Sequence, residues 1–149
     1  MADRDVKALT AQLECPVFEH TAFNRLTKPL ADCTVAIVTS ASLHHPDQPD
    51  FAGGDTSFRE LDGARRDWML GHWSPNFDAS GYAADLNVVF PIDRLDELAA
   101  SGRIGRVADR HLSYAGNQFD LATIRLDSGP AGAQLLRHDG VDVVLLTPV

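Results

Sequence analysis

The chain has 149 residues, of which 44% are hydrophobic and 23% are charged, and its formal net charge is −8. This length suits one ordinary domain with a real core, and the composition is that of a soluble globular protein. The acidic balance argues against a nucleic acid or an anionic membrane as a partner, because no run of Lys and Arg offsets it. Small molecules and proteins are therefore the expected partners.

The amino terminus lacks the basic start and the apolar core of a signal peptide, and no later run is long enough to span a bilayer. We therefore expect a cytoplasmic protein. The two cysteines, Cys15 and Cys33, form neither a CxxC pair nor a disulfide framework. Cys33 leads into a hydrophobic strand and is expected to be a small buried residue.

The first 33 residues are expected to form a helical cap packed beside a sheet. Residues 5–13 place Val6, Leu9 and Leu13 at helical spacing, and residues 23–30 form a second amphipathic piece. No chemistry is visible in this cap. Residues 34–149 are expected to supply the sheet and its helices, so the chain forms a single domain.

The strands of the sheet are predicted from runs of aliphatic and β-branched residues. Thr34–Thr39 is apolar throughout, which fits a strand buried on both faces of a parallel sheet. The other predicted strands are 57–61, 67–72, 106–114 and 141–149. A helix is predicted over 131–138, with Pro130 at its start and Gly140 as its stop.

Residues 85–98 change their hydrophobic period partway along. Up to Pro91 they are apolar and β-branched, which indicates a strand or an extended run, and from Ile92 onward the spacing is that of a helix. Asp93 is the predicted N-cap, and Gly102 is the predicted left-handed stop. Together with the strands, this pattern predicts an α/β protein of three layers, α/β/α, around a mainly parallel sheet of about four to five strands.

Two polar loops follow predicted strands and are candidates for a site. In open α/β sheets, ligands bind at the carboxyl ends of the strands, which draws attention to the loop 40–50 and its His44. A solvated loop is an equal interpretation of it. The loop 73–85 carries Asn76 and Asp78 and is long enough to suggest a function.

The common signatures of chemistry are missing from the sequence. No GxGxxG motif, P-loop or GxSxG elbow is present. A metal-dependent enzyme remains a hypothesis because one sheet edge could gather several potential ligands, although their spacing matches no metal motif and we expect none to bind metal. These residues are His44, His45, Asp47, His72 and His111.

Five segments, in order from about residue 34 to the end, resemble the selenoprotein B subunits of glycine, sarcosine, betaine and D-proline reductases. The most specific is 85–95, which reads DLNVVFPIDRL and is followed by GRIG at 102–105. The others are VAIVTSASLH at 35–44, GDTSFR at 54–59, NFD at 76–78 and GVDVVLLTPV at 140–149.

The resemblance implies where the reactive residue belongs. In that family a selenocysteine or cysteine directly follows the last of these strands, and its selenol attacks the substrate carbon, leaving a selenoether for a partner redox protein to resolve. This chain stops at Val149. We expect that it is the first part of such a polypeptide, read as ending at a UGA codon, and that it lacks reductase activity and any cofactor other than the missing selenocysteine.

The resemblance and the strand ends together suggest residues that bind a small-molecule substrate. They are Thr39, Ser40, His44, His72 and Asn87, with Asp55 and Arg59 as further candidates. A second hypothesis from another class is a non-catalytic module on the same fold, which binds a small molecule or a protein. The apolar end of the last strand also suggests self-association into a homo-oligomer.

Overall fold

The computed structural model describes residues 3–12, 17, 19, 24–72, 77, 79–118 and 121–149. The predicted calls on Cys15, Asn76 and Asp78 lie outside these residues. The main sheet has five strands: β1 (Thr34–Thr39), β3 (Phe58–Asp62), β5 (Arg106–Val107), β6 (Arg110–Tyr114) and β7 (Val143–Thr147). The α/β class and the mainly parallel sheet are confirmed.

The central strand is β1, which lies between β7 on one side and β5 followed by β6 on the other. All three neighbours run parallel to it, whereas β3 pairs antiparallel with β6 at the far edge. The paired residues of β1 and β7 extend from Val35 with Val143 to Thr39 with Thr147. Five of the six residues of β1 are buried, as its continuous apolar run predicted.

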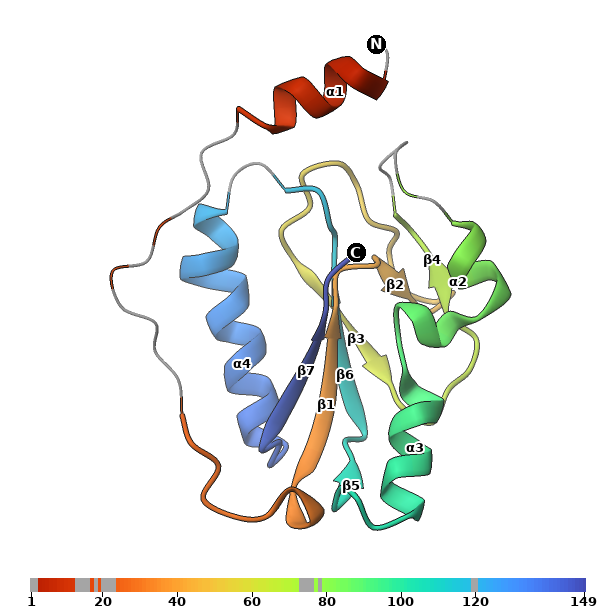
Figure 1. The fold of residues 1–149 in the computed structure, drawn as a ribbon, viewed down its shortest axis with the longest axis vertical. Helices are drawn as coiled ribbons and strands as arrows, with labels where there is room; N and C mark the ends of the chain where they lie inside the picture. Colours follow the sequence, from red (N-terminus) through yellow and green to blue (C-terminus); the bar gives the residue numbers. More distant parts are fainter. Residues whose placement is uncertain are drawn as a thin grey trace.

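Helices cover both faces of the sheet, as Figure 1 shows. Val35 and Ile37 point to one face and pack with Ile92 and Leu95 of α3 (Ile92–Ala100), while Ala36 points to the other face and packs with α4 (Gly129–His138). This alternation follows from the two-residue period of a strand. The remaining helices are α1 (Asp3–Thr10) and α2 (Ser80–Ala84).

The prediction for residues 85–91 was wrong. They contain a 3-10 turn, η2 (Leu86–Val88), and no strand. Val89 and Phe90 are 2% and 0% exposed and fill the core from this turn, so their apolar character reflects burial and not strand pairing. Asp93 is not the N-cap of α3: Pro91 occupies the cap position without a side-chain hydrogen bond, and the Asp93 N–H in the first turn donates to the Asn87 side chain at 3.1 Å. Gly102 stops the helix with φ +70°, as predicted.

Three other local predictions also need correction. Residues 24–29 contain no helix, and a short 3-10 turn, η1 (Leu30–Asp32), follows them. The predicted strand 67–72 is reduced to β4 (Met69–Leu70), which pairs with β2 (Leu43–His44) in a separate two-stranded sheet. The predicted strand 106–114 is split into β5 and β6.

Cys33 is fully buried, and its thiol donates to the Pro29 carbonyl at 3.3 Å, in agreement with the sequence prediction. Among the described residues, no helix has both the length and the apolar character required to cross a membrane. Figure 1 shows α1 at the end of the molecule where β1 and β7 finish, apart from the sheet.

Candidate functional site

The carboxyl ends of β1, β6 and β7 meet at one edge of the sheet because the three strands are parallel. Their last residues are Thr39, Tyr114 and Thr147. The segments that leave these strands therefore converge, and Figure 1 shows the end of the chain at this edge. This is the place where ligands bind in open α/β sheets.

Ser40 and Val149 touch each other at this edge. The Val149 N–H donates to Ser40 Oγ at 2.9 Å, and the Ser40 N–H donates to the Thr147 carbonyl at 3.3 Å. The first residue after β1 is thus joined to the residues after β7. Ser40 is partly exposed, so its hydroxyl is within reach of a ligand.

His72 reaches the same point from a different part of the chain. A Cβ built on Gly116 would lie 2.9 Å from His72 Nε2, 3.0 Å from the Ser40 carbonyl oxygen and 3.2 Å from the Val149 carbonyl oxygen. Gly116 therefore allows three segments to approach closely, and any larger residue would push them apart. We call the group Ser40, His72, Gly116 and Val149 the carboxyl-edge site.

The His72 ring is held by an aromatic neighbour. It stacks on Phe77, with the ring centroids 4.1 Å apart and the planes 17° from parallel. Partial burial lowers the pKa of His72 below its usual 6.5. The imidazole is therefore neutral at pH 7, where it offers one hydrogen-bond donor and one acceptor.

Thr39 lies at the same edge, and its hydroxyl is used in hydrogen bonds within the fold. Its side chain is 1% exposed, and its hydroxyl donates to the Val89 carbonyl at 3.0 Å and accepts from the Ala41 N–H at 3.2 Å. Thr147 donates to the same Val89 carbonyl at 2.8 Å. The two threonines thus fasten β1 and β7 to the turn before α3, and the role of Thr39 in binding substrate stays a prediction.

His44 and Asn87 have local partners. His44 is 3% exposed, and its Nε2 lies 2.8 Å from Asp50 Oδ1. The Asn87 amide donates to Asp85 at 2.9 Å and to Asp93 at 3.0 Å. Asp50 thus fixes the His44 ring, and Asn87 joins η2 to α3. A substrate contact for either residue stays a prediction.

Arg59 uses every N–H of its guanidinium within the protein. It bonds to the carbonyl groups of three residues, to the Ser57 hydroxyl and to the Asp55 carboxylate at 2.9 Å; the carbonyl groups are those of Pro49, Asp50 and Phe58. Burial acts to raise the pKa of Asp55, but the hydrogen bonds from Ser57 and the ion pair with Arg59 outweigh it, so the pKa is lowered. This arrangement folds residues 49–59 into one unit, and substrate binding by the pair stays a prediction.

The histidines that were considered as metal ligands lie within the described part of the chain. Among the described residues, no group of three or more His, Cys, Asp or Glu side chains has the geometry to hold a metal ion. His45 bonds to Asp67 and to the Asp62 N–H, while His111 accepts the Ile37 N–H at 2.9 Å. These hydrogen bonds hold the two rings in separate parts of the fold.

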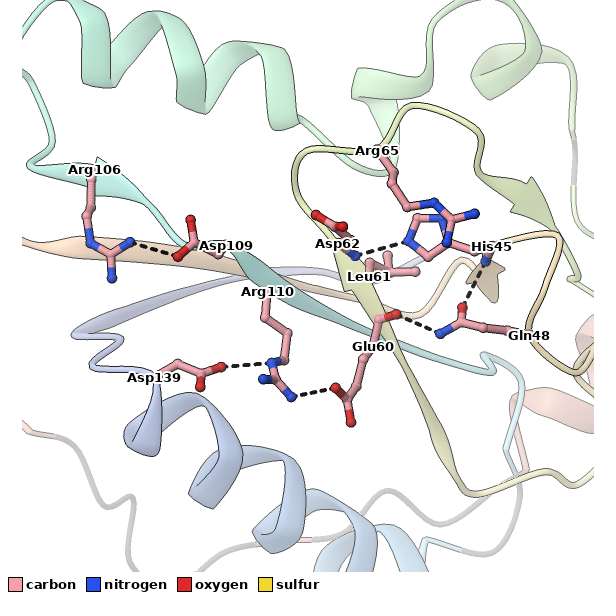
Figure 2. A pocket seen from close by; sticks show the side chains of 10 residues that line it. All are labelled: His45, Gln48, Glu60, Leu61, Asp62, Arg65, Arg106, Asp109, Arg110 and Asp139. Carbon is pink, nitrogen blue, oxygen red and sulfur yellow. Dashed lines mark hydrogen bonds and ion pairs between the residues drawn. The ribbon is translucent and has the colours of Figure 1, made fainter.

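A cavity of about 700 Å³ lies over β3 and β6 and was not predicted from the sequence. Figure 2 shows that charged side chains from several elements line it. Each of its three arginines already faces a carboxylate: Arg65 faces Asp47 and Asp67, Arg106 faces Asp109, and Arg110 faces Glu60 and Asp139. The cavity therefore presents an internally neutralised surface, with little unpaired charge for an ionic ligand.

Comparison with known proteins finds relatives among the subunits of amino-acid reductases. The chain is 34% identical over 145 residues to the D-proline reductase subunit gamma of Acetoanaerobium sticklandii, which covers 95% of this chain and 59% of the relative. It is 28% identical to the glycine reductase complex component B subunit gamma of Carboxydothermus hydrogenoformans, covering 93% of this chain and 33% of the relative.

A third relative is the sarcosine reductase complex component B subunit beta of Peptoclostridium acidaminophilum, at 28% identity over 89% of this chain and 31% of the relative. The chain thus spans between about a third and three-fifths of the length of these relatives. No solved structure matches it. The family model described as glycine/sarcosine/betaine reductase selenoprotein B matches residues 4–149. The chain therefore belongs to the glycine/sarcosine/betaine reductase selenoprotein B family.

Proposed function

We propose that the chain forms the substrate-side part of a reductase subunit that cleaves a carbon–nitrogen bond with a selenol or thiol nucleophile. The proposal is supported by the family membership and by the carboxyl-edge site. The observation that carries it is the hydrogen bond from the Val149 N–H to Ser40 Oγ, beside the His72 ring. It ties the residue at the end of the chain to Ser40, one of the residues that the sequence predicted at the site.

The nucleophile is expected at the position that follows Val149, where the family resemblance places a selenocysteine or cysteine. As a selenolate or thiolate it attacks the substrate carbon that bears nitrogen. The new bond forms as the carbon–nitrogen bond breaks, and the electron pair leaves with nitrogen, which takes up a proton. A thiolate of a partner redox protein then attacks the selenium or sulfur of this intermediate, and the carbon leaves with the electron pair of the broken bond and takes up a proton. A second thiol of the partner displaces the nucleophile from the mixed bond, so the partner ends as a disulfide and the two reducing electrons are accounted for.

The residues of the carboxyl-edge site have separate roles in this proposal. Ser40 holds the backbone of Val149 and so fixes where the next residue starts. His72, neutral at pH 7, offers a hydrogen bond to the substrate nitrogen or carboxylate. Gly116 leaves room for both. The relatives are subunits of reductase complexes, so further subunits are proposed as partners here as well.

The codon that follows Val149 provides the first test. A UGA codon or a cysteine codon, in a frame that continues through a nearby cysteine and further α/β sequence, supports the proposal, and a stop codon other than UGA sinks it. Next, the extended polypeptide with selenocysteine or cysteine at that position is assayed for thiol-dependent cleavage of the carbon–nitrogen bond in four compounds. Cleavage is read as released amine for glycine, sarcosine and betaine, and as the ring-opened amino acid for D-proline. The 149-residue chain is expected to show no turnover.

Variants then locate the site within an active extended polypeptide. Ser40→Ala and His72→Gln are expected to reduce kcat/KM at least tenfold. His138→Gln changes a histidine at the end of α4, in another part of the molecule, and serves as the matched control with unchanged rates. Equal rates in all three variants would remove Ser40 and His72 from the mechanism.

A non-catalytic binding module on the same fold is the second candidate. It is favoured by Cys33, the one cysteine in the described part of the chain, which is fully buried and is therefore not placed to act as a nucleophile. A chain that ends at Val149 in the organism and binds a small molecule without turnover would establish this candidate.

A further inference from the structure

An apolar cleft opens directly beneath Ser40. It begins as a cavity of about 250 Å³, and its lining includes Ser40 and Thr39 together with Val38, Tyr114, Leu146 and Pro148. The same Val38, Tyr114 and Leu146 also line a second cavity of about 410 Å³ between α4 and the sheet. We call the two cavities together the apolar cleft.

The cleft exists because α4 approaches the sheet unevenly. A Cβ built on Gly132 would lie 2.5 Å from Tyr114 Oη and 2.9 Å from Leu112 Cδ1, so the helix sits directly on β6. Toward β7, small residues of the helix, Gly129 and Ala133, face Val144 and Leu146 across open space. The gap is therefore a wedge that is closed at β6 and open at β7.

The walls of the cleft offer almost no polar groups. The one polar atom of the Tyr114 side chain is occupied, since its hydroxyl donates to the Ser128 carbonyl at 2.9 Å, and burial raises the pKa of this tyrosine. No charged side chain lines either cavity within the described part of the chain. An occupant of this space must therefore be uncharged and apolar.

The cleft is continuous with the carboxyl-edge site. Ser40 lines the smaller cavity and also bonds to Val149, so the residue that follows Val149 starts next to that cavity. A substrate whose reacting carbon faces that residue has its polar groups at the edge and its remaining carbons directed along β1. At about 250 Å³, the nearer cavity is smaller than most ligand pockets, which suits a compact side group.

We propose that the cleft is the side-group subsite of the substrate, and that the chain selects α-amino acids with a small aliphatic side group over glycine. This inference rests on the proposed function, because it takes the carboxyl edge as the reacting end. Val38, Tyr114 and Leu146 are the residues that set the preference.

The test is a series of dissociation constants for glycine, alanine, 2-aminobutyrate and norvaline on the isotope-labelled 149-residue chain, measured by NMR titration. Each added methylene is expected to tighten binding by about fourfold when it is buried, which gives about 60-fold from glycine to norvaline. The shifts should include the amides of Val38 and Leu146. A flat series overturns the inference.

A matched pair of variants on β7 locates the effect. Leu146 lines the cleft and is 68% exposed, whereas Leu145 precedes it on the opposite face of the strand and is 38% exposed. Leu146→Lys places a charge at the mouth of the cleft and should abolish the dependence on side-group length. Leu145→Lys should retain it. If Leu146→Lys fails to fold, Ala133→Leu on the exposed side of α4 fills the same space and should weaken norvaline most.

Three further outcomes bear on this inference, and the first two separate it from the proposed function. Turnover by the extended polypeptide with a flat binding series would reject the cleft and keep the reaction. A steep series without turnover would reject the reaction and with it the assignment of a substrate, leaving a binding module. A steep series in the 149-residue chain that disappears in the extended polypeptide means that further protein covers the cleft, which also overturns the inference.

Discussion

Lowering the pH from 7.5 to 5 should destabilise the protein through one buried imidazole, that of His111. The His111 side chain is fully buried in the middle of the molecule. Its Nδ1 accepts the Ile37 N–H at 2.9 Å, and its ring packs edge-on against Phe90. The bond bridges the break between β5 and β6, where a side chain replaces the carbonyl that a continuous strand would present to β1.

The magnitude follows from the pKa of this histidine. Burial, assisted by the positive charge of Arg66, lowers the pKa of His111 from 6.5 to about 4. Between these two values the unfolded chain binds more protons than the folded one, so the free energy of unfolding falls as the pH is lowered. The stabilisation is fully present above pH 6.5, and about 3 kcal/mol of it is lost by pH 4.

At pH 5 about 2 kcal/mol of this contribution should already be lost. The carboxylates with lowered pKa values interfere little in this range: hydrogen bonds from Arg65 reduce the pKa of Asp67 to about 2, and Asp47 and Asp142 also have lowered pKa values. His72 has a lowered pKa as well and titrates in the same direction. Measurements in a His72→Gln background remove the contribution of His72 to the pH dependence of the free energy of unfolding.

The assay is urea denaturation at several pH values between 7.5 and 5, in that background, with and without His111→Asn. Asparagine carries an acceptor on Cγ where histidine has Nδ1, so it can keep the Ile37 bond without titrating. The variant should lose most of the pH dependence that His111 causes. Identical slopes in the two proteins would refute the reasoning, whatever their absolute stabilities.

Three further predictions concern the framework around the site. Gly132→Ala should destabilise the chain by about 1–3 kcal/mol, because the new methyl group would meet Tyr114 Oη; denaturation of this variant beside Ala133→Ser measures it. Asn87→Ala should lower the melting temperature by the equivalent of about 1 kcal/mol through loss of the hydrogen bonds that join η2 to the first turn of α3, whereas an unchanged melting temperature would show that these bonds contribute nothing. Arg59→Lys should cost about 2 kcal/mol or more and increase proteolysis within 49–59, since a lysine cannot satisfy the five acceptors, and a wild-type cleavage pattern would contradict this.

The layers and the sheet could be predicted because burial leaves a clear pattern in the sequence. β1 and β7 were recognised from uninterrupted aliphatic runs, and α3 and α4 from their spacing and their glycine stops. The same reasoning failed over 85–91 for a physical reason. Val89 and Phe90 are as buried as strand residues but reach the core from a 3-10 turn, and hydrophobicity records burial and not backbone hydrogen bonding.

The interruption between β5 and β6 was beyond local prediction. It depends on the His111 ring reaching across to the Ile37 N–H, a contact between residues 74 positions apart. The carboxyl-edge site was partly predictable. Ser40 follows directly from the rule that ligands bind at strand ends, but Gly116 does not, because its need for space arises from segments at 40, 72 and 149 that only the fold brings together.

Arg59 illustrates why family motifs and substrate contacts are separate questions. Its segment, 54–59, is one of those that resemble the family, and an arginine beside an aspartate is a plausible carboxylate-binding pair from sequence alone. In the folded chain the five donors already have acceptors, and a substrate carboxylate would have to displace one of them at the cost of leaving it unsatisfied. A motif of this kind is explained by the loop that it folds. Ser40 differs from Arg59 in its place in the fold: its hydroxyl bonds to Val149 beside the apolar cleft, so the position of Ser40, and not an unused hydrogen bond, directs attention to it.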